Sequence, residues 1–278
     1  MNAATPFPAR IGLGTWKMGE GDRRDLPAIR HALEHGYRLI DTAEMYAQGG
    51  AERVIGKALL AHGLQHRPRL CIVSKVLPDN ASRHGTVRAC EASLERLGCG
   101  YLDVYLLHWP GRHPLAQTLE AFVELRERGL IRHFGVSNLD AGELQQWRAA
   151  ERTLGITDGA CTNQVYYCMA QRGIEFAQLA WQRAHGFCTM AYSPLGQGDL
   201  LRDPMVKQLA ADLKLTPAQL ALAWVLRHPE MVAIPKSSDP QRIEQNLRAA
   251  DVTLDAATLA RIDARFPPPR AELPLATS

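Results

Sequence analysis

Short runs of apolar residues alternate with longer amphipathic stretches along the whole chain. The runs have the length of buried strands, and the stretches space their apolar residues three or four apart, which is typical of helices packed on one side. We expect eight strands, at residues 11–16, 37–43, 70–76, 102–109, 131–138, 161–167, 187–196 and 231–237. Helical patterns lie between them, for example at 26–36, 51–63, 86–98, 115–129 and 143–155.

This regular alternation predicts the fold class. Continuous apolar runs indicate strands buried on both faces, and a strict strand–helix order favours parallel pairing through right-handed crossovers. Eight such units predict an α/β fold, a closed (β/α)8 TIM barrel. The main alternative is a doubly wound open sheet. Its dinucleotide fingerprint is incomplete here, because GLGTWK at residues 12–17 lacks the third glycine and no acidic ribose ligand follows at the required spacing.

Two further helical patterns, at 205–215 and 254–266, fall outside the repeat, and we expect them to be two extra helices. The chain has 278 residues, of which 46% are hydrophobic, so it can bury a large core. It contains no low-complexity segment or linker pattern. We therefore expect residues 1–278 to form a single barrel domain with an extended C-terminal tail.

The net charge and the positions of the cysteines argue against several classes of protein function. The net charge is only +3 and both signs are mixed along the chain, which argues against a nucleic-acid-binding arm. The N-terminus resembles neither a signal peptide nor a membrane span, so a cytoplasmic protein that binds no membrane is expected. The six cysteines form none of the close pairs of metal or redox motifs, which favours reduced, mostly buried thiols.

Polar side chains lie at or just beyond the ends of the second, third and fourth predicted strands. Asp41 and Tyr46 come after one apolar run, Lys75 ends the next, and His108 with Trp109 ends the third. In a barrel, the carboxyl ends of the strands converge on one mouth, where chemistry is carried out. Taken singly, each residue has another explanation: a helix cap, a loop aromatic, a surface lysine or a satisfied core histidine.

Together these residues suggest a proton-transfer site. Lys75 lies between apolar residues and needs a carboxylate partner, which Asp41 on the neighbouring strand can supply. An ammonium beside Tyr46 would lower the pKa of the phenol and make it a general acid at neutral pH. His108 could orient and polarise a carbonyl oxygen. The carbonyl carbon would still need an electron pair, which a hydride-donating cofactor supplies.

These residues lie in motifs that resemble those of the aldo-keto reductases. The motifs, in order, are GLGTW, LIDTAEMY, VSKV, YLDVYLLHWP, GVSN, TNQVYY, AYSPLG and IPKSSDPQRIEQN. The resemblance covers nearly the whole chain and implies an NADP-dependent enzyme that reduces carbonyl compounds. It implies that Tyr46 is the proton donor, that Lys75 and Asp41 tune it, and that His108 orients the substrate.

The resemblance also implies a groove for NADPH. Ser137, Asn138 and Gln164 match residues that hydrogen-bond the nicotinamide carboxamide, and Tyr192 matches the aromatic residue that stacks on the ring. If the catalytic residues were absent, we would interpret these four residues as ordinary polar residues of strand ends and turns. The other residues that we assign to this part of the groove are Gly14, Thr15, Trp16, Asp41, Ser193, Leu195 and Ile234.

The segment IPKSSDPQR is the strongest anion-binding pattern in the chain. Lys236, Ser237 and Ser238 precede the last expected barrel helix, and Arg242 lies in its first turns, where barrels commonly bind phosphate. An ordinary helix start with solvated charges is the alternative. The resemblance implies that these residues bind the adenosine 2′-phosphate. At the adenine, Asn246 is retained, but Gln245 stands where many family members carry glutamate.

The expected substrate pocket is aromatic and open. We assign to it Trp16, Met18, Tyr46, His108 and Trp109, whereas Trp147, Trp181 and Trp224 lie in helical patterns and are expected to pack in the core. The insertion after the fourth strand and the tail are short, so small aldehydes and ketones are expected substrates. The motifs resemble most those of bacterial members that reduce methylglyoxal and related 2-oxoaldehydes.

Two other functions remain open on the sequence. The same fold serves as a cofactor-sensing regulatory subunit with little turnover, although no partner-docking segment is visible. A metal-dependent hydrolase would need several ligands at the strand ends, and only Asp41 and His108 qualify. We therefore expect no metal, a small-molecule carbonyl substrate, and a monomer.

Overall fold

Parallel strands form one closed sheet in the computed structural model, which describes residues 6–277. The eight strands described there pair in chain order, each parallel to the next. Ile11 forms a parallel bridge with Ala233, so the first strand also meets the last and the barrel predicted from the sequence is confirmed. The strands are β1 Leu13–Gly14, β2 Leu39–Asp41, β3 Cys71–Val76, β4 Leu102–Leu107, β5 Ile131–Ser137, β6 Thr162–Tyr166, β7 Cys188–Tyr192 and β8 Met231–Ala233.

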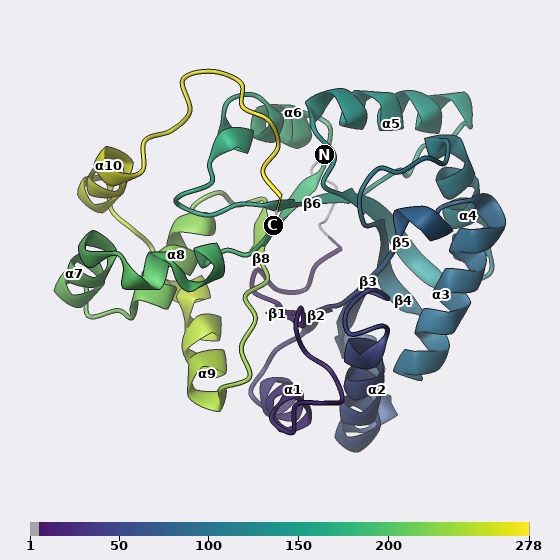
Figure 1. The fold of residues 1–278 in the computed structure, drawn as a ribbon, viewed down its shortest axis with the longest axis horizontal. Coiled ribbons are helices and arrows are strands. Elements are labelled where there is room, and N and C mark those ends of the chain that lie inside the picture. Colours follow the sequence, from purple (N-terminus) through teal and green to yellow (C-terminus); the bar gives the residue numbers. More distant parts are fainter. Residues whose placement is uncertain (1–5, 278) are drawn as a thin grey trace.

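Helices surround the strands as an outer ring (Figure 1). Among them, α7 and α10 match the two patterns expected outside the repeat, and both lie at the periphery of the ring. The helices are α1 Asp25–Glu34, α2 Gly50–His62, α3 Arg83–Leu97, α4 Leu115–Glu127, α5 Ala141–Thr153, α6 Gln178–Ala184, α7 Pro204–Asp212, α8 Pro217–Val225, α9 Pro240–Arg248 and α10 Ala256–Arg265.

The alternation of side chains along each strand places the polar residues at the mouth of the barrel. Successive side chains of a strand point to opposite faces. On β2, Leu39 packs inside the barrel, and Asp41 is the next residue that points inward. On β3, Val73 packs inside and Lys75 follows in the same way. β4 repeats the pattern and is followed by His108. Apolar residues thus fill the barrel up to a polar layer at the carboxyl ends.

A second apolar layer lies between the barrel and the helices. Trp147 and Trp224 are fully buried in it, and Trp181 packs against it, as expected. In residues 6–277, no helix is both long and apolar enough to span a membrane. A single domain over residues 1–278 stays a prediction, of which residues 1–5 and 278 lie outside the described range.

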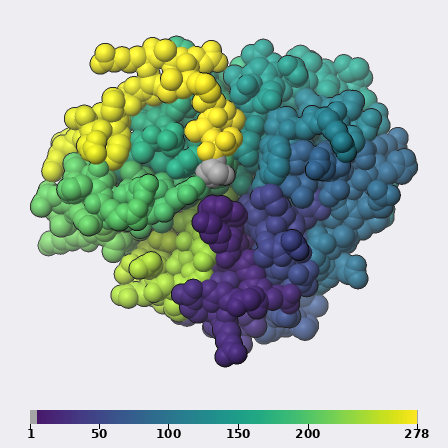
Figure 2. All heavy atoms as spheres, viewed as in Figure 1, coloured from purple at the N-terminus to yellow at the C-terminus, as the bar shows by residue number. Residues whose placement is uncertain are grey.

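The C-terminal tail crosses the face of the molecule that carries the mouth of the barrel. Figure 2 shows this tail, in yellow, running from the edge to the centre of the face, beside the purple N-terminal region. Thr277 lines the central cleft. Although the tail is short, it therefore reaches the opening that we expected to be left uncovered.

Candidate active site

A cleft of about 1330 Å³ opens at the carboxyl ends of the strands. It continues from the centre of the barrel to the loop between β8 and α9. Most of the predicted site residues line it. They are Gly14, Trp16, Asp41, Tyr46, His108, Trp109, Ser137, Asn138, Gln164, Tyr192, Ser193, Leu195, Ile234, Lys236, Ser237, Ser238, Arg242, Gln245 and Asn246.

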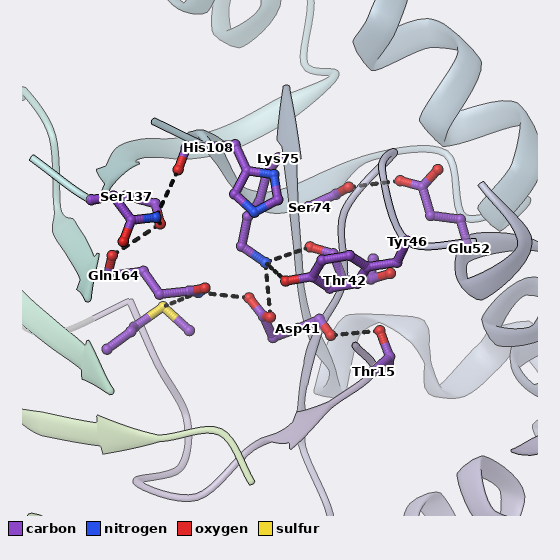
Figure 3. Close-up of polar contacts among 12 residues, drawn as sticks. Thr15, Asp41, Thr42, Tyr46, Glu52, Ser74, Lys75, His108, Ser137 and Gln164 are labelled. Atoms are coloured by element: carbon purple, nitrogen blue, oxygen red, sulfur yellow. Dashed lines mark hydrogen bonds and ion pairs between the residues drawn. The ribbon is translucent and has the colours of Figure 1, made fainter. Parts of the chain in front are cut away.

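Lys75 lies fully buried just beneath this cleft (Figure 3). Its Nζ donates to Asp41 Oδ2 at 2.8 Å and to the backbone oxygen of Thr42 at 2.8 Å. The same nitrogen lies 3.2 Å from the hydroxyl oxygen of Tyr46. On the other side of the carboxylate, Gln164 Nε2 donates to Asp41 Oδ1 at 2.7 Å. The acid and the phenol of one motif and the amine of another therefore form one connected group.

The charges of Lys75 and Asp41 compensate each other inside the barrel. Burial acts to lower the pKa of Lys75, but Asp41 and Tyr46 outweigh it, and the pKa is raised above its ordinary value. Burial raises the pKa of the Asp41 carboxyl, and Lys75 and Gln164 oppose that rise. The raised pKa keeps the Lys75 amine charged at neutral pH, and its contacts to three oxygens compensate this charge inside the barrel.

Tyr46 differs from its expected behaviour in the direction of its pKa. The sequence predicted a lowered pKa, but burial raises it, and Lys75 only partly offsets that rise. Burial wins because a phenolate in this position would lose its hydration. Tyr46 therefore stays protonated at neutral pH, which a proton donor requires, while Lys75 is placed to stabilise the phenolate left after transfer.

His108 is a neutral neighbour of Tyr46. The two ring centroids lie 5.9 Å apart in an edge-to-face arrangement. Burial, helped by the charge of Lys75, lowers the pKa of His108 to about 2. Its Nδ1 is buried and has no hydrogen-bond partner among the described residues, which leaves Nε2 as the ring nitrogen able to meet a ligand. His108 can thus donate a hydrogen bond without carrying a charge.

The residues expected to bind a carboxamide form hydrogen bonds with their neighbours along one wall of the cleft. Ser137 Oγ donates to the backbone oxygen of Gln164 at 2.9 Å. Asn138 Nδ2 donates to the backbone oxygen of His108 at 3.1 Å, and Tyr192 OH donates to Asn138 Oδ1 at 2.9 Å. A ligand amide would therefore have to compete with, or add to, hydrogen bonds already made.

The basic end of the cleft lies around the start of α9. The guanidinium of Arg242 is exposed and makes no ion pair with any residue in the range 6–277. Lys236 Nζ donates to Ser238 Oγ at 2.7 Å, and Ser238 donates its own proton to Asp25 Oδ1 at 2.7 Å. Because a carboxylate only accepts, Ser238 is not the ready donor that we expected for a phosphate; it would have to rotate away from Asp25.

A buried asparagine and a tightly packed glycine shape the walls of the cleft. Asn246 is buried, lines the cleft, and its Oδ1 has no hydrogen-bond partner within residues 6–277. At Gly14, an added Cβ would lie 2.5 Å from the backbone oxygen of Ile234, so only glycine fits where β1 approaches the segment after β8.

The sequence is similar to those of known proteins over nearly its whole length. A family model described as the aldo/keto reductase family matches residues 10–265. The chain belongs to the aldo/keto reductase family. Methylglyoxal reductase YeaE of Escherichia coli K12 is 42% identical over 274 residues, which cover 95% of this chain and 93% of that protein. An aldo-keto reductase of Mycobacterium sp. strain KMS is 37% identical, over 94% of this chain and 90% of that protein.

A solved structure shows the same fold. The aldo-keto reductase of Klebsiella pneumoniae in complex with NADPH has a TM-score of 0.89 and 43% sequence identity. The match covers 97% of this chain and 95% of that one. Aldo/keto reductase membership therefore rests on agreement of sequence and fold along nearly the whole chain.

Besides Lys75, which is buried beneath the cleft, two predicted residues of this aldo/keto reductase do not line it. Thr15 is fully buried, and its Oγ1 donates to the backbone oxygen of Asp41 at 2.8 Å, so it supports the strand that carries Asp41. Met18 is only 1% exposed and packs in the core, beside a smaller cavity of about 390 Å³. The reason is the left-handed backbone of Lys17, with φ of 63°, which turns the chain before Met18.

Several lining residues were missed from the sequence. Arg23 and Arg24 add positive charge on the loop before α1, and Lys17 lies over the ring of Trp16 at 4.2 Å. Arg23 and Arg24 could have been found from the sequence, because two adjacent arginines stand just before a predicted helix. Thr277 gave no signal, because its position depends on the path of the tail.

Proposed function

We propose that this aldo/keto reductase uses NADPH to reduce small aldehydes and ketones to alcohols, and that 2-oxoaldehydes such as methylglyoxal are among its substrates. The observation that carries the proposal is the Tyr46 hydroxyl, 3.2 Å from a buried ammonium and beside a neutral imidazole. The names of its relatives give further support: one is a methylglyoxal reductase, and another was crystallised with NADPH.

The residues of the cleft fit NADPH chemically. The unpaired Oδ1 of Asn246 can accept a hydrogen bond from the amino group of adenine. Arg242, Lys236 and Ser237 line the same end and can meet the 2′-phosphate with charge and a hydroxyl. At the barrel centre, the polar wall of Ser137 and Gln164 offers donors and acceptors suited to a carboxamide.

The reaction divides between cofactor and protein. When bound, NADPH would supply a hydride to the carbonyl carbon, where a C–H bond would form as the π electrons move to oxygen. Tyr46 then gives its hydroxyl proton to that oxygen, which completes the alcohol and leaves a phenolate. Lys75 stabilises this phenolate across 3.2 Å, and Asp41 holds Lys75 in place. His108 donates a hydrogen bond to the substrate oxygen and orients it without changing charge.

The mouth of the cleft favours small substrates. Trp16 and Trp109, each 36% exposed, give it apolar walls, and Tyr46 lines the same cleft. Thr277 lines the same cleft, so the tail limits its width. A compact substrate with a polar carbonyl and a short carbon chain suits this space.

A substrate panel tests the proposal. NADPH absorbance is followed with methylglyoxal, phenylglyoxal, nitrobenzaldehyde and sugars, and oxidation is expected with the small aldehydes. The same protein is titrated with NADPH in parallel. Tight NADPH binding with flat traces for every substrate would contradict the enzyme proposal and favour a cofactor sensor.

We further propose that the protein works as a monomer in the cytoplasm. The monomer follows from a cleft in which every proposed role is filled by one chain. Size-exclusion chromatography with light scattering tests it: a dimer at assay concentration would contradict the proposal.

A further inference from the structure

Two histidines and a glutamate meet outside the cleft, where α1 packs beside α9 (Figure 1). His31 lies in the last turn of α1, His35 caps the C-terminus of that helix, and Glu244 lies on α9. Glu244 Oε1 is 3.0 Å from Nε2 of His31 and 4.0 Å from Nε2 of His35. The two imidazole rings stack with their centroids 3.8 Å apart. One ligand atom from each residue lies within 4.8 Å of the others.

The tautomer of His35 is set by the backbone. Its Nδ1 lies 2.8 Å from the backbone oxygen of His31. A carbonyl oxygen only accepts, so Nδ1 carries the proton and a neutral His35 presents a lone pair on Nε2. Metal-binding histidines are commonly held in this way, with the other ring nitrogen donating to a backbone carbonyl.

Nε2 of His35 lies near a negative oxygen. Glu244 Oε1 also only accepts, and at 4.0 Å no proton is shared between the two. Arg248 Nη2 lies 3.4 Å from the other carboxylate oxygen, Oε2, which leaves Oε1 directed at the imidazoles. A cation would bind all three atoms once the two rings, whose planes now differ by 23°, rotate so that their Nε2 atoms converge on it.

The cluster is also open to solvent. The side chains of His31, Glu244 and His35 are 22%, 34% and 44% exposed, so an ion can enter and water can complete its coordination. The side chains of His31 and Glu244 are nevertheless mostly covered, and the packing of α1 beside α9 limits how far they can separate.

We propose that His31, His35 and Glu244 bind a divalent transition-metal ion, with Zn²⁺ as the ion best matched to the site. Two imidazoles and one carboxylate are a donor set that Zn²⁺ uses, with water in the remaining position. Binding requires the Nε2 proton of His31 to move to Nδ1 or to leave. The ion would join α1 to α9, the helix that carries Arg242 and Asn246. The site uses no catalytic residue and does not depend on the proposed reaction.

Calorimetric titration with ZnCl₂ tests the site in tag-free protein that has been stripped with EDTA. Wild type should bind one Zn²⁺ per chain. His35→Gln and Glu244→Gln should each weaken that binding at least about tenfold, because each removes a ligand atom or its charge. NADPH binding, measured on the same samples, shows that the variants are folded.

A second histidine pair provides the matched control. His62 and His66 are also four residues apart, with ring centroids at 4.8 Å, but neither has an acidic partner within ion-pair distance among the described residues. His66→Gln should leave the Zn²⁺ affinity unchanged. Replacing Zn²⁺ with Co²⁺ should give visible absorption bands in wild type that His35→Gln lacks. Absence of binding to wild type, or equal binding by wild type, His35→Gln and Glu244→Gln, would overturn the proposal.

Discussion

The hydroxyl oxygen of Tyr46 lies 3.2 Å from the ammonium nitrogen of Lys75, and Asp41 lies at 2.8 Å from the same nitrogen. Burial keeps the phenol protonated, since it raises the pKa of Tyr46. The ammonium lowers the free energy of the phenolate that proton donation produces. The same surroundings thus keep the proton in place before the reaction and stabilise the charge afterwards.

Tyr46→Phe should keep cofactor binding and lose carbonyl reduction, because it removes the proton donor and preserves the ring. A general acid contributes about 10² to 10⁴-fold, so kcat should fall by that factor. Steady-state kinetics with methylglyoxal and an NADPH titration measure the two effects.

Tyr101→Phe is the control for this substitution. Tyr101 is not among the residues that line the cleft, and its hydroxyl has no hydrogen-bond partner among the described residues, so kcat should stay unchanged. If Tyr46→Phe retained more than about a tenth of the wild-type kcat, Tyr46 would not be the proton donor.

Lys75→Met should lower turnover and move the alkaline limit of activity upward. Without the ammonium, nothing offsets the burial that raises the Tyr46 pKa, so the phenol would lose its proton only at higher pH while becoming a poorer donor. The pH dependence of kcat, measured for wild type and variant, shows both changes. Identical pH profiles and rates in the two proteins would show that Lys75 does not control the pKa of Tyr46.

Asp41→Asn should lower the stability of the folded protein more than it lowers the catalytic rate. It leaves the Lys75 ammonium buried with a weaker partner, and breaking a buried pair in this way typically costs about 3–5 kcal/mol. Urea unfolding of wild type and variant at neutral pH measures the difference. An unchanged free energy of unfolding would show that Asp41 is not the compensating charge.

His108 should make the folded protein less stable as the pH falls below 6.5. Its pKa is about 2 in the folded state against an ordinary value of 6.5, so between these values only the unfolded chain binds the proton. Stability is therefore fully present above 6.5 and declines below it by about 1.4 kcal/mol per pH unit for one proton. His108→Asn lacks this linkage.

The measurement compares urea unfolding of wild type and His108→Asn at several pH values between about 5 and 6.5. The wild-type slope should be steeper by one proton, because the carboxylates contribute equally to both proteins. Equal slopes would mean that His108 is not held neutral. In the pH dependence of kcat, His108 should add no transition near 6.5.

The barrel and its catalytic group could be predicted because both follow from local pattern. Asp41 and Lys75 each continue an inward-facing series of apolar residues, so their position at the mouth is a consequence of strand periodicity. Met18 could not be placed in the same way, since the left-handed turn at Lys17 changes its direction and glycine is absent there.

Other features depended on contacts between distant parts of the chain. The proton of Ser238 goes to Asp25, 213 residues away, and the upward shift of the Tyr46 pKa depends on how completely the barrel buries the ring. The meeting of His31 with Glu244 also spans 213 residues. No local pattern contains such information, because it arises only when distant segments of the chain pack against one another.

Arg242→Ala should weaken NADPH binding and leave NADH binding nearly unchanged. The two cofactors differ by one phosphate, and the Arg242 guanidinium is an exposed planar donor at the end of the cleft where that phosphate is expected. A hydrogen bond to a charged group contributes about 1.5–3 kcal/mol, which corresponds to about a 10- to 100-fold rise in Kd. The variant should also show a weaker salt dependence of NADPH binding, since one charge pair is gone.

Arg248→Ala is the matched control for Arg242→Ala, because Arg248 lies on the same helix, is exposed and does not line the cleft. Both cofactors are titrated by quenching of tryptophan fluorescence, which Trp16 and Trp109 at the cleft should report. Gln245 affects this test little, since a change in the adenine region acts on NADPH and NADH alike. If Arg242→Ala weakens the binding of both cofactors equally, or if Arg248→Ala weakens NADPH binding as much as Arg242→Ala does, then Arg242 does not contact the 2′-phosphate. The phosphate would then be bound elsewhere, and the charge of Arg242 would act on the cofactors only at long range.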